Sequence, residues 1–252
     1  TGIVGENGAG KTTLFKALLG LVPIASGSAK INGQDIAELS LADRESIGTV
    51  LAESFFNDIY TIKDVNRLLK SFYRKFDENY FLRKCADFHL PKDQRLKELS
   101  TGMKAKLKTL TALSHEAQLL ILDEPTSGLD VSARYEILDI LQDYLVAHPQ
   151  CSILISSHIS SDLEKLCDDI YYLKAGKVLL HEETDRLLDA YGVLINSGEY
   201  SGLTSEEAMD RMSRRAEAEG FGRATVTFRM RDWGISRQRY WGEPIPMISC
   251  PK

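Results

Sequence analysis

The sequence predicts an α/β fold built around a parallel β-sheet, and three observations lead to this prediction. A glycine-rich loop at residues 5–12 lies between a short aliphatic strand and a helix. An uninterrupted aliphatic run at residues 119–122 is typical of a parallel strand that is covered on both faces. A helical stretch at 134–146 then separates this run from a second buried strand at 152–156. With 252 residues, 43% of them hydrophobic, the chain can bury one large core or two smaller ones.

The loop at residues 5–12 fits the pattern G-x-x-x-x-G-K-[ST], which is typical of phosphate-binding loops. Residues 2–4 predict the end of a buried strand, and residues 13–19 predict a helix that Gly20 closes. Glycines let the backbone point successive N–H groups at phosphate oxygens, and the N-terminus of the helix adds partial positive charge. The alternative interpretation is a glycine-rich turn with a chance lysine.

This loop supplies the predicted nucleotide-binding residues. We expect Lys11 to reach the β- and γ-phosphates of a nucleoside triphosphate, and the Thr12 hydroxyl to take one position on Mg²⁺. The predicted binding residues of the loop are Gly5, Asn7, Gly8, Ala9, Gly10, Lys11, Thr12 and Thr13.

Composition narrows the class of protein. The net charge of −5 argues against a surface that binds nucleic acid generally, so nucleic acid is not expected as a partner. No apolar run approaches the roughly 20 residues that span a membrane, and no signal peptide is visible. The four cysteines form no C-x-x-C pair, which favours reduced cytosolic thiols. Because the chain begins inside a strand without a Met, we expect a fragment that is cut at both ends.

Along the first half, strands and helices alternate in the prediction. Pro23 stops the first helix. Residues 29–31 predict a short strand that leads into a turn at Asn32 and Gly33, and residues 47–51 predict a buried strand.

A long helical stretch is predicted next. Thr61 is its expected N-cap, apolar residues recur at helical spacing as far as Leu90, and Pro91 ends it. The aromatic residues of this stretch are expected in the core rather than on a ligand-binding face. Further along, a hairpin turn is expected at 174–177 and a helix over 182–190.

Two further segments carry candidate site residues. The segment at 99–103 opens a helix, and Ser100 and Gly102 there can present a hydroxyl and backbone N–H groups to an anion. By itself this signal is weak, because a serine before a helix is an ordinary N-cap. Asp123 and Glu124 follow the aliphatic strand at its carboxyl end, where ligands of open α/β sheets bind.

Two adjacent carboxylates in that position predict contact with a metal ion or water, and a surface turn is the alternative. A turn at 127–130 follows them. His158 comes just after the next buried strand; by itself, a histidine there would be interpreted as a surface residue.

Taken in this order, five segments give residues 1–192 a resemblance to the ATP-binding subunit of ABC transporters. They are the loop 5–12, the signature segment 99–103, Asp123 with Glu124, the turn 127–130, and His158. The resemblance implies a P-loop NTPase with a RecA-like parallel sheet and a helical subdomain at about 61–112. The stretch 122–130 looks most like that of bacterial exporters of the ABC-2 type.

The resemblance also implies roles and partners. Glu124 would be the base for hydrolysis and His158 the catalytic switch histidine, while Asp123 and Thr12 would hold Mg²⁺. Ser100 and Gly102 would contact ATP bound to a second ATP-binding subunit. ATP binding would close this dimer and drive a membrane-spanning permease subunit, so the protein would be cytoplasmic and peripheral to the inner face of the cell membrane.

Three departures from the family pattern stand out. The family's first strands and adenine-stacking aromatic residue are missing, so we expect an unpaired sheet edge beside residues 1–4 and weak nucleotide binding. The family's glutamine after strand 47–51 aligns with Ala52, and Glu53 is the nearest polar residue. Met103 stands where the signature usually ends in glutamine.

The last 60 residues differ in charge type. Residues 1–192 hold 15 lysines and 7 arginines, whereas residues 193–252 hold 1 lysine and 8 arginines. A loop at 197–203, a helix at 204–219 and a strand at 225–230 are predicted there. Interleaved basic and aromatic residues leave RNA binding open as an interpretation.

Residues 193–252 resemble an internal segment of leucyl-tRNA synthetase, on the stretch R-D-W-G-I-S-R-Q-R-Y-W-G at 231–242. The resemblance implies a small α+β fragment that cannot activate leucine, because the family's H-I-G-H and K-M-S-K-S signatures are absent. We place the seam between Tyr191 and Ser197, and the pattern favours an accidental join. The alternative function for the chain is therefore a synthetase-derived fragment with RNA binding or no independent activity.

Overall fold

A computed structural model of the chain describes residues 1–51 and 56–184, Arg186, and five separate later residues. Those five are helical and lie where a helix over 204–219 is predicted: Glu207, Arg211, Arg214, Arg215 and Ala218. The predictions for Ala52 and Glu53, and the seam, loop and strand predicted between 191 and 252, lie outside the described residues. The chain divides into two compact units, Thr1–Ala190 and Tyr191–Lys252, and all the elements below belong to the first.

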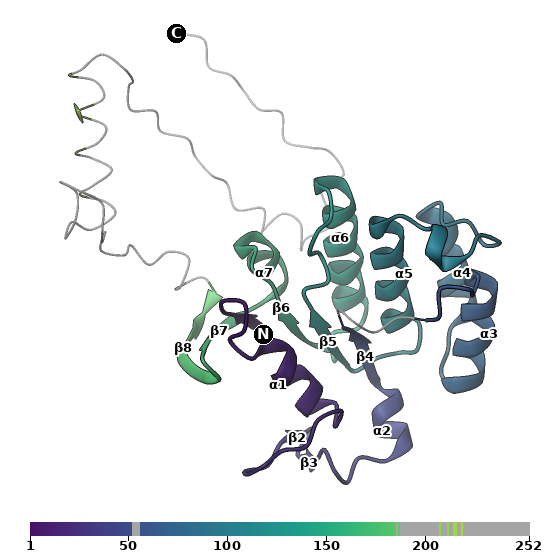
Figure 1. Ribbon diagram of the computed structural model, residues 1–252, viewed down its shortest axis with the longest axis horizontal. Helices are drawn as coiled ribbons and strands as arrows, with labels where there is room; N and C mark the ends of the chain where they lie inside the picture. Colours follow the sequence, from purple (N-terminus) through teal and green to yellow (C-terminus); the bar gives the residue numbers. More distant parts are fainter. Residues whose placement is uncertain are drawn as a thin grey trace. The chain divides into compact units, whose positions relative to one another are not determined.

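A six-stranded sheet in the order β4-β5-β6-β1-β7-β8 forms the centre of the first unit (Figure 1). Its neighbouring strands run parallel, except for the antiparallel pair β7 and β8. The α/β prediction with a parallel sheet is thus confirmed. The strands are β1 (Gly2–Val4), β4 (Ile47–Val50), β5 (Leu119–Asp123), β6 (Ser152–Ser156), β7 (Asp169–Lys174) and β8 (Lys177–Glu183).

β1 lies in the middle of this sheet. Gly2 pairs with Ile155 of β6 on one side and with Ile170 of β7 on the other. The predicted unpaired edge beside residues 1–4 is therefore wrong, because two strands from later in the chain cover both sides of β1. The edges of the described sheet are β4 and β8.

At β5 both faces of the sheet are buried, as the aliphatic run of this strand predicts. Leu120 and Leu122 point into the larger core cluster, whereas Ile121 points into a second cluster that contains Phe15 of helix α1 (Lys11–Leu18). All four side chains are fully buried. Successive strand residues alternate between faces, so this single strand anchors a hydrophobic core on each side.

Helices cover the two faces. Residues of α5, α6 and α7 belong to the larger cluster, and α1 packs on the opposite face. A separate two-stranded hairpin, β2 (Lys30–Ile31) and β3 (Gln34–Asp35), turns at Asn32 and Gly33 as predicted. The helices are α1 (Lys11–Leu18), α2 (Leu41–Glu45), α3 (Ile62–Phe72), α4 (Glu78–Asp87), α5 (Thr101–Leu113), α6 (Val131–Ala147) and α7 (Ser160–Leu166), with a 3₁₀ turn η1 (Leu96–Glu98).

Several helix bounds differ from the predictions for local reasons. The stretch predicted from 62 to 90 is two helices, because the Asp77 side chain accepts a hydrogen bond from the Tyr80 N–H and starts α4 anew. α6 begins before residue 134, since Asp130 caps it. The helix predicted over 182–190 is wrong at its start, because Glu182 pairs with Ile170 in the β7–β8 ladder.

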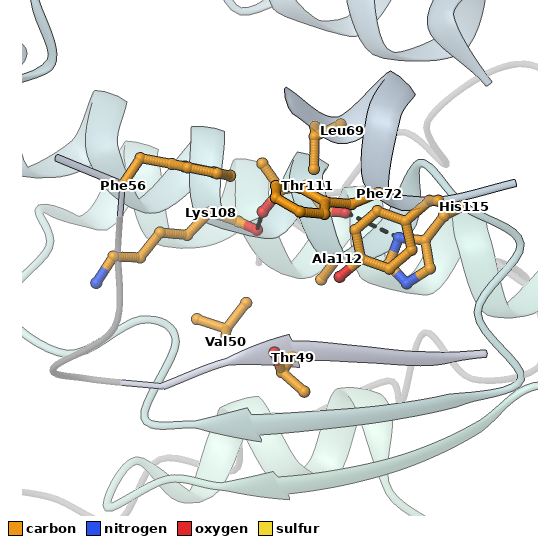
Figure 2. Close-up of a pocket in the computed structure, with 10 residues that line it drawn as sticks. Thr49, Val50, Phe56, Leu69, Phe72, Lys108, Thr111, Ala112 and His115 are labelled. Atoms are coloured by element: carbon orange, nitrogen blue, oxygen red, sulfur yellow. Dashed lines mark hydrogen bonds between the residues drawn. The ribbon is translucent and has the colours of Figure 1, made fainter. Parts of the chain in front are cut away.

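A cavity of about 280 Å³ lies between β4, α3 and α5 (Figure 2). On its wall, the ring of His115 stacks on Tyr73 with centroids 4.0 Å apart, and its Nδ1 lies 3.1 Å from the Thr111 carbonyl oxygen. Tyr73 packs against the core as predicted for the aromatic residues, but Phe72 is 66% exposed at the rim. The cavity is lined by Thr49, Val50, Phe56, Leu69, Phe72, Tyr73, Lys108, Thr111, Ala112 and His115.

Candidate functional site

The glycine-rich loop connects β1 to α1 and curls around a cavity of about 310 Å³. Gly10 has a φ of 106°, which a residue with a side chain rarely adopts. A Cβ on Gly5 would lie 2.3 Å from the Leu173 carbonyl oxygen, so only glycine fits there. The structure brings the predicted loop residues together, with Gly5 just outside the lining. The lining residues are Asn7, Gly8, Ala9, Gly10, Lys11, Thr12, Thr13 and Glu124.

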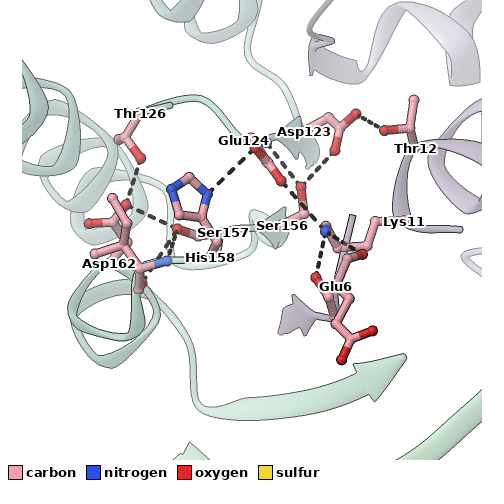
Figure 3. A network of polar contacts seen from close by, with 12 residues as sticks. Glu6, Lys11, Thr12, Asp123, Glu124, Thr126, Ser156, Ser157, His158 and Asp162 are labelled. Atoms are coloured by element: carbon pink, nitrogen blue, oxygen red, sulfur yellow. Dashed lines mark hydrogen bonds and ion pairs between the residues drawn. The ribbon is translucent and has the colours of Figure 1, made fainter. Parts of the chain in front are cut away.

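Lys11 is held at the base of this loop and is only 7% exposed. Its Nζ donates to the carbonyl oxygens of Gly5 at 2.7 Å and Glu6 at 3.4 Å. The same Nζ lies 3.5 Å from Oε1 of Glu124. The ammonium group is thus anchored by the loop and directed toward the carboxylate that follows β5 (Figure 3).

Asp123 is buried at the carboxyl end of β5, 3% exposed. Its Oδ2 accepts a hydrogen bond from Thr12 Oγ1 at 2.6 Å, and its Oδ1 accepts one from Ser156 Oγ at 2.7 Å. Asp123 and Ser156 are register partners of β5 and β6. The hydrogen bond between Thr12 and Asp123 therefore joins the two predicted metal-binding residues. The register of the sheet adds Ser156, which the sequence did not predict.

Glu124 lies between Lys11 and His158 in the site. Its backbone has a φ of 46°, in the left-handed region that costs a residue with a side chain about 1 kcal/mol or more. Its N–H donates to Ser156 through both Oγ at 2.9 Å and the carbonyl oxygen at 3.1 Å. These bonds stabilise the turn that aims the carboxylate between Lys11 and His158.

His158 faces Glu124 from the loop after β6. Its Nδ1 lies 3.6 Å from Oε2 of Glu124, while Oε1 faces Lys11. His158 is 56% exposed, so its ring remains open to a ligand. The two predicted catalytic residues therefore contact one another, beside the loop cavity.

The donor set around Asp123 fits Mg²⁺. The carboxylate and the Thr12 hydroxyl offer the oxygen ligands that this ion prefers, and Mg²⁺ takes its remaining positions from phosphates and water. Among the residues that the structure describes, no group of three or more His, Cys, Asp or Glu side chains could hold an ion alone. An ion here would thus share its coordination with a bound nucleotide.

Ser100 and Gly102 lie apart from this cluster. Ser100 caps α5, its Oγ accepting a hydrogen bond from the Met103 N–H at 3.2 Å, and neither residue lines the loop cavity. Gly102 packs close to α6, where an added Cβ would meet the Ala133 Cβ at 3.2 Å. Within one chain the structure shows the N-cap, and contact with a nucleotide stays a prediction.

A second buried polar group adjoins His158 and was not predicted. The Asp162 carboxylate in α7 is 0% exposed and receives hydrogen bonds from Thr126, Ser157 and Arg134. The sequence offers no signal for it, because an acidic residue in the first turn of a short helix is ordinarily exposed.

The ABC transporter family matches residues 1–127, half of the chain. The chain belongs to the ABC transporter family. In the described part of this family member, no helix combines the length and the apolar character needed to cross a membrane.

The curated relatives include other ATP-binding proteins of this family. The ABC transporter ATP-binding protein YtrB of Bacillus subtilis is 31% identical over 190 residues, 75% of this chain and 64% of that protein. The Nod factor export ATP-binding protein I of Neorhizobium galegae is 32% identical over 184 residues, 71% of this chain. The chain spans 52% to 64% of the length of these two relatives.

A different relative matches a short segment. The leucine–tRNA ligase of Solibacter usitatus is 66% identical over 61 residues, which are 24% of this chain and 8% of that protein.

Solved structures agree with the fold. The ATP-binding subunit of an ABC transporter superposes with a TM-score of 0.65 at 26% identity, covering 84% of this chain and 86% of that one. The ATP-binding cassette MJ0796, in a dimeric post-hydrolysis state bound to ADP and Pi, has a TM-score of 0.64 at 21% identity and covers 73% of this chain and 84% of that one. The second likeness concerns the fold alone.

Proposed function

We propose that this chain is the ATP-binding and ATP-hydrolysing subunit of an ABC exporter. The observation that carries the proposal is the convergence of Lys11, Asp123, Glu124 and His158 at the cavity of the phosphate-binding loop. The names of the relatives support it, since YtrB is an ABC transporter ATP-binding protein and the Neorhizobium relative an export ATP-binding protein.

In this proposal each residue has one task. Lys11 contributes positive charge beside the β- and γ-phosphates, in a position that its bond to the Gly5 carbonyl oxygen already fixes. Glu124 accepts the proton of the attacking water, and His158 holds the second oxygen of that carboxylate. When bound, Mg²⁺ would be held by Thr12 and Asp123 and would neutralise developing phosphate charge.

Partners follow from the same proposal. Ser100 and Gly102 point to a second ATP-binding subunit, because they lie outside the cavity of their own chain. The dimer of the MJ0796 cassette supports such a pairing. A membrane-spanning permease subunit would carry the substrate and would hold this chain at the inner face of the cell membrane.

The test is Lys11→Ala in the full chain. We expect ATP affinity to fall at least about tenfold, since no backbone donor replaces the ammonium charge, while circular dichroism stays unchanged. Lys63→Ala is the matched control, because Lys63 is exposed and pairs with Asp93 away from the cavity. Unchanged ATP affinity in Lys11→Ala would reject the assignment of the site.

One observation favours a separate origin for the end of the chain. We assign the 61-residue match with leucine–tRNA ligase to the end of the chain, where the ligase-like stretch at 231–242 lies. A Cupriavidus metallidurans relative of the export type matches 254 aligned residues at only 28% identity. The higher identity, 66%, favours a ligase origin for the tail and a seam between Tyr191 and Ser197.

If the tail is an inactive carried-over piece, the full chain and residues 1–192 alone should hydrolyse ATP equally and should both fail to bind tRNA. Salt-dependent tRNA binding by the full chain alone would favour the RNA-binding alternative. A DNA read from one molecule across codons 185–205 tests the seam itself. An intact open frame there, with both outer ends of the chain natural, would contradict an accidental join.

A further inference from the structure

The Asp162 carboxylate joins three separate segments of the chain. Its Oδ2 accepts hydrogen bonds from Thr126 Oγ1 at 2.6 Å and from Ser157 Oγ at 3.2 Å. Its Oδ1 accepts one from Arg134 Nε at 2.6 Å. Thr126 follows β5, Ser157 follows β6, and Arg134 lies in the first turn of α6, so one carboxylate contacts all three segments. Figure 3 shows the contacts with Thr126 and Ser157.

These contacts reach both sides of the proposed catalytic pair. Thr126 lies two residues after Glu124, and Ser157 immediately precedes His158. The Ser157 hydroxyl also accepts a hydrogen bond from the Ile159 N–H at 3.0 Å, which fixes the loop on the other side of the histidine. The distance between His158 and Glu124 therefore depends on two loops that meet at Asp162.

Burial makes this junction sensitive to small changes. Asp162 is fully buried and its partner Arg134 is only 16% exposed. The attraction between the two charges therefore offsets the hydration that both groups lose on burial. An asparagine in this place would keep the shape, but its amide nitrogen cannot accept a hydrogen bond. At least one of the donors would then lose its acceptor.

We propose that Asp162 is a positioning residue that sets the placement of His158 relative to Glu124. The inference rests on the proposed ATP hydrolysis, and it adds a residue that itself contacts neither the nucleotide loop nor the catalytic carboxylate. A merely structural role would predict lower stability with unaltered turnover. Positioning predicts slower turnover in a chain that stays folded.

The test compares Asp162→Asn with Asp139→Asn in the full chain. Asp139 is the matched control, because its ion pair with Lys165 also joins α6 to α7 but is exposed and distant from both catalytic loops. We expect kcat for ATP hydrolysis to fall at least tenfold in Asp162→Asn with KM changed less than threefold. Asp139→Asn should match the unsubstituted chain.

A double variant separates action through His158 from an independent effect. Adding Asp162→Asn to His158→Ala should slow turnover by less than twofold further. The inference is overturned if the double variant loses as much activity as the product of the two single losses in kcat. It is also overturned if Asp162→Asn hydrolyses ATP at the normal rate.

A second pair of substitutions and an NMR measurement test the inference even if Asp162→Asn does not fold or the chain does not hydrolyse ATP. Should Asp162→Asn fail to fold, the pair Thr126→Val with Ser157→Ala removes the loop contacts and retains the ion pair with Arg134; normal turnover there would overturn the inference. The imidazole NMR signals of His158, identified by their loss in His158→Ala, should shift in Asp162→Asn and stay in Asp139→Asn without any nucleotide. An unshifted signal refutes positioning, whereas absent hydrolysis by the unsubstituted chain, with the signal shifted, refutes only the proposed ATPase.

Discussion

At the scale of single residues, Glu124 contacts two oppositely placed groups with its two oxygens. Lys11 lies 3.5 Å from Oε1, and His158 lies 3.6 Å from Oε2. A carboxylate shared in this way is held in place without being buried, since Glu124 remains 24% exposed. That combination suits a base, which needs a fixed position and access to water.

We therefore expect Glu124→Gln to lower ATP hydrolysis by at least about a hundredfold, the usual scale for losing a general base, while ATP binding remains. The amide keeps the size of the side chain but accepts no proton. Turnover and nucleotide affinity should be measured on the same preparation. Hydrolysis near the rate of the unsubstituted chain would remove Glu124 from this role.

Individual site residues were predictable from the sequence to very different degrees. Lys11 and Asp123 belong to local patterns, because a loop motif and a strand end both leave a signature within a few positions. Ser156 and Asp162 do not. Their roles come from the register of β5 with β6 and from the packing of α7, and both depend on residues about 30 positions away.

At the scale of elements, local capping explains both what was predicted and what was missed. Thr61 and Asp64 form the capping box that begins α3, and burial of Leu69 and its neighbours holds that helix on the core. Ser40 and Asp43 form the same box at α2, a five-residue helix that the hydrophobic pattern alone does not reveal. The pKa of Asp64 lies below its usual value, because the backbone N–H and the hydroxyl of Thr61 donate to the carboxylate.

His115 connects α5 to the end of α3 and gives the fold a dependence on pH. Burial lowers the pKa of its imidazole, and its backbone contacts and Glu45 offset only part of that effect. The unfolded chain takes up a proton near pH 6.5, whereas folded His115 stays neutral to lower pH. Stability is therefore full above pH 6.5 and falls below it, by at most about 1.4 kcal/mol per pH unit.

Urea unfolding at pH 7.5 and pH 5.5 checks this expectation. The unfolding free energy should fall more in the unsubstituted chain than in His115→Gln, which carries no titrating ring. His89→Asn is the control, because His89 is exposed and asparagine tolerates its φ of 53°. An equal fall in the unsubstituted chain and His115→Gln would contradict the role of His115.

At the scale of the whole molecule, the order of strands could not be deduced from local patterns. The sequence predicts strands at 2–4, 47–51, 119–122 and 152–156, yet pattern alone does not place β1 between β6 and β7. Parallel pairing joins residues more than 150 positions apart, such as Gly2 and Ile155. The prediction of an unpaired sheet edge beside β1 was wrong for this reason.

The arrangement of the site also bears on assembly. Ser100 lies outside the cavity that Lys11 and Glu124 line, so a complete site in the proposed dimer takes Ser100 from the other chain. In a two-fold dimer the same surface is used twice, and each chain both gives and receives this residue.

Mixing two inactive chains tests this sharing. Chains with Ser100→Arg and chains with Lys11→Ala should each be inactive, but a heterodimer would place both lesions in one site and leave the other site intact. With random pairing at equal amounts, about a quarter of the normal hydrolysis should return. The matched control mixes Lys11→Ala with Glu124→Gln, two lesions of the same cavity, where every heterodimer has two damaged sites and no activity should return. If the first mixture stays as inactive as its components while each chain folds, or if the control mixture recovers as well, Ser100 does not act across an interface.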